Sequence, residues 1–396
     1  MSQLPETAAP PLPQVRLKIA RRSSHPWIFQ KMVEKPTTRL PPGSVVDVLD
    51  RDGQWAGRGF YNGHSRIALR ILTADPAEAI DDAFFARRVE RAVALRRDWL
   101  RLDAVTDAYR LAHSEGDGLS GLVADRFGPV IVLEFFAAGM HRFRAAIQAA
   151  LSAHFPDSRF YWFAEEHVRK QESFDLREPE APPPEVITEH GLRFRVAPGS
   201  KHKTGFFLDQ RDNRLALAGF CPGRRVLDLC CNTGGFAVYA KALGKAEEVV
   251  GVDIDEAVIA LARANANLNQ ARVRFVQADL FPWLRDVIPS GQRFDVVVLD
   301  PSKQTRDREE VGVALRRYLD MNRLALQAVA PGGIFLTCSC TGLVGENDFL
   351  DTVRRAAWQA GRTVQVLRVA GAAPDHPFLV HVPEGRYLKA VFCRVF

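Results

Sequence analysis

From about residue 200 onward, the chain alternates between short apolar segments and amphipathic segments, and this alternation restricts the fold more than any other feature. Strands are predicted at 225–230, 248–254, 272–278, 294–300, 332–339, 363–370 and 387–396. Helical patterns separate most of them, at 236–243, 255–269, 310–330 and 346–361. Near-continuous apolar strands with amphipathic helices between them predict a parallel sheet covered on both faces. The last strand follows the sixth without a helix, so a hairpin-like return would make it antiparallel to its neighbours.

The first half of the chain has a different pattern, rich in β-structure. Its predicted elements are a hairpin around Asp52-Gly53 within 44–62, a strand at 65–72, a helix at 81–101, a hairpin at 125–136, a helix at 141–155, a strand at 159–166 and a hairpin at 186–198. A loose tail of about 14 residues precedes them. We therefore predict an α/β protein of three domains: a small β-rich domain at 14–80, an α+β middle domain at 81–195 and the Rossmann-like seven-stranded domain at 196–396.

Charge and composition exclude several classes of protein. The formal charge is +6, and residues 1–110 contain 18 basic against 13 acidic side chains, which favours a phosphate-facing surface or a solvated basic face. No apolar run approaches the ~20 residues of a membrane span, and no signal peptide is visible. The six cysteines do not form a disulfide framework. These features predict a cytoplasmic protein with no membrane partner.

Four carboxylates follow four successive strands of the predicted sheet: Asp228, Asp253, Asp279 and Asp300. The carboxyl edge of an open parallel sheet is where α/β proteins bind ligands. Asp253 is placed to accept hydrogen bonds from ribose hydroxyls, and Asp279 from the exocyclic amine of an adenine. Each carboxylate could instead cap the helix that follows it. Four aspartates at the ends of four successive strands favour a site for a nucleoside cofactor over four separate helix N-caps.

The turn after Asp228 indicates which nucleoside binds. It has the sequence D-L-C-C-N-T-G-G, which lacks the spaced glycines that hold a pyrophosphate. An acidic loop suits a cationic ligand without phosphate, and S-adenosylmethionine is such a ligand. The pattern resembles the class I S-adenosylmethionine-dependent methyltransferases. We therefore assign to the cofactor site, besides the four aspartates, the residues Asn232, Thr233, Gly234, Gly235, Ile254 and Leu280.

A cysteine at the end of the fifth predicted strand offers a nucleophile. Cys340 would lie beside Asp300, and a thiolate there can add to C6 of a cytosine and make C5 nucleophilic. Asp300 would then bind the N3/N4 edge of the base. Cys340 could instead be a small buried hydrophobic residue. Cys338 lies two residues earlier and is expected on the same face, so periodicity does not choose between the two, and no cluster of ligands nearby favours a metal site.

Several longer stretches carry a more specific resemblance. They are HPWIF (25–29), SEGDGLSGLVADRFG (114–128), HKTGFFLDQRDNR (202–214), LDPSK (299–303), LTCSCTG (336–342) and the segment 375–396. Together they resemble the bacterial 23S rRNA (cytosine-5) methyltransferases, which have an N-terminal PUA domain, a middle domain and a methyltransferase domain. The resemblance covers nearly the whole chain after residue 14.

That resemblance implies roles for particular residues. The family's presumed nucleophile matches Cys340 rather than Cys338. The segment preceding the first strand helps to close over the cofactor, which adds Phe207, Asp209 and Gln210 to the cofactor site. Pro301 and Lys303 would contact the substrate. The chain departs from the family's D-P-P-K at one position, because Ser302 replaces the second proline, which loosens the loop and adds a hydroxyl.

The resemblance also implies 23S rRNA, or an assembly intermediate of the large subunit, as partner. Arg21 and Arg22 in the first domain are predicted to contact phosphates, whereas His25-Pro26-Trp27 is interpreted as a packed turn. Two alternatives stay open: a base N-methyltransferase on the same fold, which would need no cysteine, and a non-catalytic RNA-binding or ribosome-assembly factor. The sequence leaves open whether the protein is a monomer or a homodimer.

Overall fold

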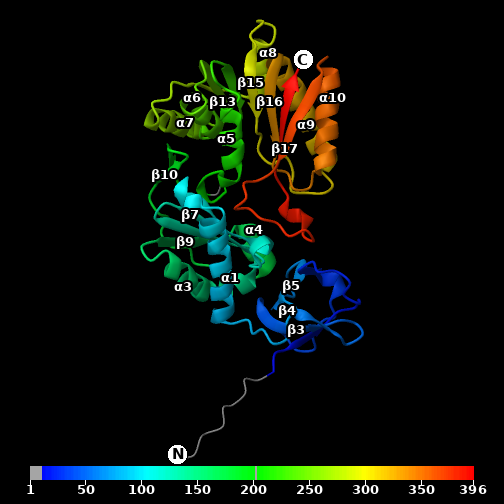
Figure 1. The fold of residues 1–396 in the computed structure, drawn as a ribbon. Coiled ribbons are helices and arrows are strands. Elements are labelled where there is room, and N and C mark those ends of the chain that lie inside the picture. The colour runs from blue at the N-terminus through cyan, green and yellow to red at the C-terminus, as the bar shows by residue number, and fades with distance from the viewer. Residues whose placement is uncertain (1–10, 201–202) are drawn as a thin grey trace, which may run out of the picture. The chain divides into compact units, whose positions relative to one another are not determined.

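The computed structural model describes residues 11–200 and 203–396, which form two compact units (Figure 1). The first contains residues 11–100, 110–182 and 377–383, and the second contains 101–109, 183–200, 203–376 and 384–396. Most of the predicted N-terminal tail and His202 of the motif at 202–214 lie outside the described residues. The domain boundaries at 80 and 195 stay a prediction. No helix in the described part of the chain is long and apolar enough to cross a membrane.

The first unit begins with a five-stranded sheet whose order is β1-β3-β4-β5-β2. Its strands are β1 (Gln14–Arg16), β2 (Trp27–Phe29), β3 (Ser44–Leu49), β4 (Trp55–Tyr61) and β5 (Ile67–Thr73). The antiparallel pairing of β3 with β4 confirms the hairpin around Asp52-Gly53. Val46 and Val48 flank Asp47 in β3 and, with Leu69 of β5, belong to a separate buried cluster.

A second sheet in this unit has the order β6-β7-β8-β9. Its strands are β6 (Ala108–His113), β7 (Leu122–Phe127), β8 (Val130–Phe135) and β9 (Arg159–Phe163), and the accompanying helices are α1 (Asp82–Ala94), α2 (Ala138–Arg142), α3 (Arg144–His154) and α4 (Glu166–Glu172). The hairpin predicted at 125–136 is confirmed by β7 and β8. The helix predicted at 141–155 is two helices, which meet at Phe143.

The second unit contains the seven-stranded sheet, in the order β14-β13-β12-β15-β16-β18-β17. The strands are β12 (Arg225–Leu229), β13 (Glu248–Asp253), β14 (Arg274–Gln277), β15 (Phe294–Leu299), β16 (Val329–Ser339), β17 (Val364–Ala370) and β18 (Lys389–Val395). All seven predicted strands are confirmed. β18 lies between β16 and β17 and is antiparallel to both, which confirms the expected reversal.

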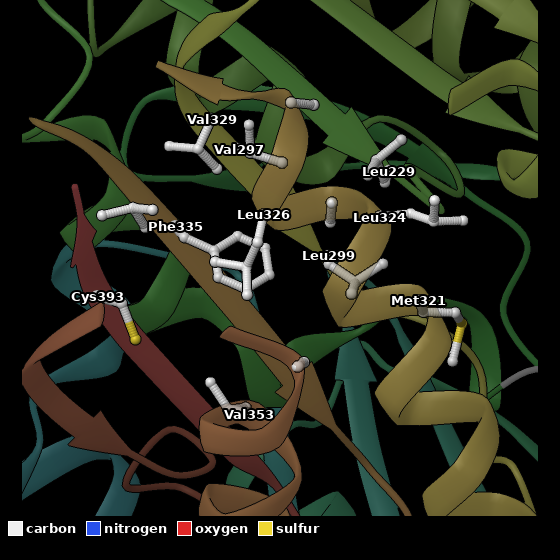
Figure 2. Close-up of a cluster of buried hydrophobic side chains, with 14 of the residues drawn as sticks. Leu229, Val297, Leu299, Met321, Leu324, Leu326, Val329, Phe335, Val353 and Cys393 are labelled. Carbon is white, nitrogen blue, oxygen red and sulfur yellow. The ribbon is translucent and has the colours of Figure 1, made fainter. Parts of the chain in front are cut away.

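Six helices and a two-stranded hairpin complete this unit. The helices are α5 (Arg211–Ala218), α6 (Gly235–Ala242), α7 (Glu256–Leu268), α8 (Leu280–Val287), α9 (Val311–Ala328) and α10 (Glu346–Gln359), and β10 (Glu185–Glu189) pairs with β11 (Leu192–Val196). Side chains from α9 and α10 pack against the sheet in one buried cluster, in which Leu326 and Val353 lie near Phe335 of β16 (Figure 2). The central strands of the sheet are therefore buried by helices, as the sequence pattern predicts, whereas the edge strand β17 is mostly exposed.

The sequence interpretation missed α5 and α8. Helix α8 has only eight residues and contains Pro282, so its periodic pattern is too short to detect. Its start has a signal nonetheless, since the Asp279 side chain accepts a hydrogen bond from the Phe281 N–H and a proline within the first turn is compatible with a helix.

A buried ion pair holds α5 to the segment after β17. Both guanidinium Nη atoms of Arg211 donate to the carboxylate of Asp375, at 3.1 and 2.9 Å, and both side chains are almost fully buried. Burial acts to raise the pKa of Asp375, but the charges and hydrogen bonds of His376 and Arg211 lower it well below its usual range. The ionised carboxylate therefore stabilises this unit at neutral pH.

We expect Asp375→Asn to lower the free energy of unfolding by about 3–5 kcal/mol, because it removes the buried partner of Arg211 and leaves this buried charge only the exposed carboxylate of Asp212. The exposed pair of Asp351 with Arg354 is the control, and Asp351→Asn should change stability by less than about 1 kcal/mol. Urea unfolding at pH 7 measures both. Because the pKa of Asp375 is lowered, its contribution is present above about pH 4 and is lost as the pH falls below that range. Equal losses in the two variants would contradict this account.

Candidate cofactor and nucleophile site

The register of the parallel strands brings the predicted carboxylates to one edge of the sheet. Asp228 of β12 lies opposite Gly251 of β13 and Val298 of β15. Asp253 is the last residue of β13, and Asp300 directly follows β15. Burial raises the pKa of the Cys230 thiol, and the charges of all four carboxylates, Asp279 included, raise it further. The four carboxylates therefore all lie close enough to Cys230 to interact with it.

Helix capping explains only one of these four carboxylates. Asp279 is the N-cap of α8. The N-cap of α7 is Asp255 rather than Asp253, and that of α6 is Gly234 rather than Asp228. Asp300 accepts a hydrogen bond from the side chain of Gln210, Nε2 to Oδ2 at 3.0 Å. Asp228 also accepts a first-turn N–H of α6, that of Ala237, although it is not the N-cap residue, whereas Asp253 and Asp300 have positions that helix capping does not explain.

The turn between β12 and α6 adopts an unusual backbone conformation. Cys230, Asn232 and Gly234 have φ values of 59°, 45° and 81°, in the left-handed region that favours glycine. The Asn232 N–H donates to Oδ2 of Asp253 at 2.9 Å, which links this turn to the end of β13. A Cβ at Gly234 would lie 3.1 Å from Phe275, so the turn packs closely against the neighbouring elements. Gly235 begins α6 and has an ordinary φ.

Asp228 is the most deeply buried of these carboxylates, with 1% of its surface exposed. Its Oδ2 accepts from the Ala237 N–H at 3.0 Å, and its Oδ1 has no hydrogen-bond partner among the described residues. Burial, together with the charges of Asp300 and Asp253, raises its pKa well above the usual value. A buried carboxylate oxygen of this kind favours a positively charged partner.

These residues fit S-adenosylmethionine. Its ammonium and sulfonium charges would compensate the carboxylates, and it has no phosphate for them to repel. Ile254, beside Asp253, exposes 66% of its surface and offers an apolar contact for a base. Leu280 is half-buried and packs against the main core of the unit. The N–H of Thr233 donates to the Oδ1 of Asn232, at 2.8 Å, and further orders the turn.

The segment before α5 is held against this edge by side-chain hydrogen bonds. Asp209 and Gln210 are buried, and the hydroxyl of Tyr387 donates to Oδ2 of Asp209 at 2.6 Å. Gln210 binds Asp300, as described above. The carbonyl oxygen of Phe207 accepts from the Arg214 guanidinium at 2.9 Å. Asp209 and Gln210 are thus placed near the carboxylate edge by contacts of their own.

Cys338 and Cys340 have different surroundings. Cys338 pairs with Ala390 inside the sheet and is fully buried, and burial raises the pKa of its thiol well above the usual value. β16 ends at Ser339, so the alternation of strand side chains does not extend to Cys340, which is partly exposed. The Cys340 Sγ lies 4.0 Å from the carbonyl oxygen of Pro301. Of the two cysteines, Cys338 is buried and Cys340 is partly exposed.

The loop after Asp300 is held in place by Thr341. The Thr341 Oγ1 accepts from the Gln304 N–H at 3.0 Å and is hydrogen-bonded to the Tyr318 hydroxyl at 2.8 Å. Within this loop Pro301 is buried, whereas Ser302 and Lys303 are exposed. The Asp-Pro-Ser-Lys loop and the cysteine segment therefore form one hydrogen-bonded surface.

The predicted RNA contacts in the first unit differ from each other. The Arg21 guanidinium donates to the carbonyl oxygens of Ser23 and Ala56, whereas Arg22 is exposed. Trp27 donates through Nε1 to Oε1 of Glu115, at 2.7 Å, which agrees with the packed-turn interpretation. Arg22 is therefore the better placed of the two arginines for contact with a phosphate.

Sequence reasoning missed four residues that shape this edge: Thr341, Tyr318, Tyr387 and Lys389. Their contacts join segments far apart in the chain. Lys389 did carry a signal, because it is a charged residue at the start of the apolar strand that was predicted at 387–396.

Comparisons with known proteins agree with this geometry. A family profile described as "S-adenosylmethionine-dependent methyltransferase" matches residues 163–386, and a PUA-like domain profile matches 18–74. The chain belongs to the S-adenosylmethionine-dependent methyltransferases. Its cofactor is accordingly S-adenosylmethionine, and a PUA-like domain precedes the methyltransferase fold.

Other members of the family match along nearly the whole chain. Ribosomal RNA large subunit methyltransferase I of Salmonella arizonae is 40% identical over 98% of this chain and 99% of its own length. The protein of the same name from Escherichia coli O139:H28 is 40% identical over 94% and 95%. SMU.776, a putative methyltransferase solved in complex with SAH, is similar in fold, with a TM-score of 0.81 at 21% identity, covering 96% of this chain and 99% of its own.

Asp228→Asn should weaken the binding of S-adenosylmethionine at least about tenfold, because it removes a buried negative charge. In the wild-type protein the pKa of Asp228 is raised, and the positively charged S-adenosylmethionine requires the ionised form of this carboxyl group. Affinity should therefore fall as the pH falls through that pKa, and the variant should lose this dependence. Isothermal titration calorimetry between pH 5 and 7.5 measures both effects.

Asp295→Asn is the matched control for this experiment. The Asp295 carboxylate also accepts a backbone N–H, from Arg225 at 2.9 Å, but it lies at the opposite end of β15. This variant should keep the wild-type affinity and its pH dependence. A wild-type affinity that stays constant over the pH range, or an Asp228→Asn variant that binds normally, would contradict the role of Asp228.

Proposed function

We propose that this protein methylates C5 of a cytidine in 23S ribosomal RNA, with Cys340 as the nucleophile. The observation that carries the proposal is the position of Cys340. This cysteine is partly exposed, and its Sγ lies 4.0 Å from the carbonyl oxygen of Pro301, the residue after Asp300. The names of the 40% identical relatives support ribosomal RNA of the large subunit as the substrate.

The chemistry assigns one step to each group. When bound, S-adenosylmethionine would supply a methyl group to a carbon nucleophile, with S-adenosylhomocysteine as the leaving group. Cytosine C5 is a poor nucleophile, but addition of the Cys340 thiolate to C6 forms a C–S bond and shifts electron density to C5. After methyl transfer, the loss of the C5 proton and the cleavage of the C–S bond restore the aromatic base and release the thiolate. The enzyme is thus unchanged after one turnover.

The residues around Cys340 have supporting roles in this proposal. Asp300, oriented by Gln210, accepts a hydrogen bond from the amino group of the cytosine. Pro301 stiffens the loop against the base, and the exposed Lys303 contacts the RNA backbone. A cytosine within structured RNA must leave its stack to reach this loop, at a cost of a few kcal/mol. Contacts between basic side chains and phosphates offset that cost.

We expect Cys340→Ala to abolish the formation of 5-methylcytidine, because it removes the proposed nucleophile. Cys338→Ala is the matched control and should retain activity, since the Cys338 side chain is buried in the sheet. The assay incubates each protein with labelled S-adenosylmethionine and unmodified ribosomal RNA, followed by nucleoside analysis of the product. RNA containing 5-fluorocytidine should additionally form a stable covalent complex with the wild-type protein and none with Cys340→Ala.

The same assay separates the alternatives. A base N-methyltransferase would remain active with Cys340→Ala and would yield a different methylated nucleoside. A ribosome-assembly factor would bind the RNA and transfer no methyl group. Either result would overturn the proposed reaction.

The binding of ribosomal RNA should weaken steeply with salt, because contacts between basic side chains and phosphates release counterions. Arg22→Ala should weaken binding a few-fold and reduce the slope of log K against log salt by about one. Arg354→Ala, on the exposed surface of α10, is the control and should leave the slope unchanged. Filter binding at several salt concentrations measures the slope, and equal slopes for the wild type and Arg22→Ala would exclude Arg22 from the interface.

A further inference from the structure

Lys389 is a charged residue in a place where the sheet is otherwise apolar. It begins β18, and only 2% of its surface is exposed. Of the lysines whose burial the structure describes, it is the one in the buried class. A lysine is rarely buried unless its charge is compensated or used. Its position therefore requires an explanation.

The pairing of β16 with β18 places Lys389 beside the cysteine segment. Lys389 lies opposite Ser339, the residue before Cys340. Its Nζ donates to the carbonyl oxygen of Thr341 at 2.8 Å and to that of Tyr387 at 2.8 Å. An ammonium has three N–H donors, so two of them bind carbonyl groups around the cysteine and one is left for another acceptor. The charge is thus anchored next to the proposed nucleophile.

Several charged or titratable groups surround this ammonium and Cys340. Burial lowers the pKa of Lys389 to about 8, the charges of Cys340 and Glu346 act to raise it, and Lys303 acts to lower it. Burial raises the pKa of Tyr318 on α9 to about 12, and Cys340 and Asp300 add to the increase. Glu346 begins α10, and Asp300 and Lys303 belong to the loop after β15. Near Cys340, carboxylates therefore disfavour a thiolate and the two lysines favour it.

We propose that Lys389 is a positioning residue that holds the Cys340 side chain as a thiolate by placing a buried positive charge beside it. This inference rests on the proposed role of Cys340. The ammonium keeps its proton throughout the reaction. It stabilises the negative sulfur before the sulfur adds to C6 and again when cleavage of the C–S bond returns the electron pair to the sulfur. Lys303 is exposed and more strongly screened by solvent, so the larger contribution belongs to Lys389.

The test measures the charge on Cys340 without RNA or methyl transfer. The full-length protein is alkylated with iodoacetamide across a range of pH, and mass spectrometry follows the peptide that contains Cys340. Only the thiolate reacts, so the pH midpoint of alkylation reports its formation. Lys389→Met and Lys389→Gln should each move that midpoint up by about one pH unit or more, whereas Lys389→Arg should retain most of the wild-type value. The glutamine still donates hydrogen bonds to the carbonyl groups, which separates charge from packing.

Lys241 provides a matched control. Its Nζ also donates to two carbonyl oxygens, of Ala246 and Glu247, both at 2.8 Å, but it lies on α6 and not at the cysteine segment. Lys241→Met should leave the midpoint of Cys340 unchanged. Thermal melting and the binding of S-adenosylmethionine report whether each variant folds.

The outcomes distinguish this inference from the proposed function. An unchanged midpoint in a folded Lys389→Gln or Lys389→Met protein would overturn the role of Lys389 and leave it a structural lysine. Formation of 5-methylcytidine by Cys340→Ala would instead overturn the role of the cysteine, whatever the alkylation shows. If both roles hold, methyl transfer by Lys389→Gln at pH 7 should be at least about tenfold slower than in the wild type and should recover as the pH rises.

Discussion

The parallel register of β12 with β13 and β15 determines where three carboxylates of the candidate site lie. Because the three strands end at the same edge, Asp228, Asp253 and Asp300 come together although the chain separates them widely. The helices that cover the sheet help to fix this register. A strand cannot shift by one residue without turning its buried side chains to the other face of the sheet. The core is thus what fixes the position of the polar groups.

Two electrostatic preferences of opposite sign meet at this edge. Burial and the charges of Asp300 and Asp253 raise the pKa of Asp228, and a positively charged cofactor favours its ionised form. At the cysteine segment the proposed thiolate of Cys340 is itself negative, so nearby carboxylates disfavour it and the positive charge of Lys389 favours it. The two regions are joined through Asp300, whose loop is hydrogen-bonded to Gln210 on one side and to the Thr341 segment on the other. The charge of Asp300 therefore acts both on the cofactor edge and on the cysteine segment.

The sequence predicts the sheet and its acidic edge well, because both follow from local patterns. Apolar runs identify the seven strands, and an aspartate at the end of a strand stays at the end of that strand in the fold. The choice between Cys338 and Cys340 is different: it depends on β16 ending at Ser339, and strand ends are poorly specified by local pattern. Lys389 depends on a register between β16 and β18, nearly fifty residues apart in the chain, and no local signal contains that pairing. The same holds for Tyr387 with Asp209.

The insertion of β18 between β16 and β17 also has a consequence for the order in which the sheet assembles. β17 is made before β18 in the chain, yet its strand pairing is with β18. β17 therefore joins the sheet only through β18, and the pairing of β18 with β16 closes a loop of some sixty residues, such as that between Gly333 and Val395. Because β18 also carries Lys389, one segment of the chain both attaches the outermost strand and completes the surroundings of Cys340.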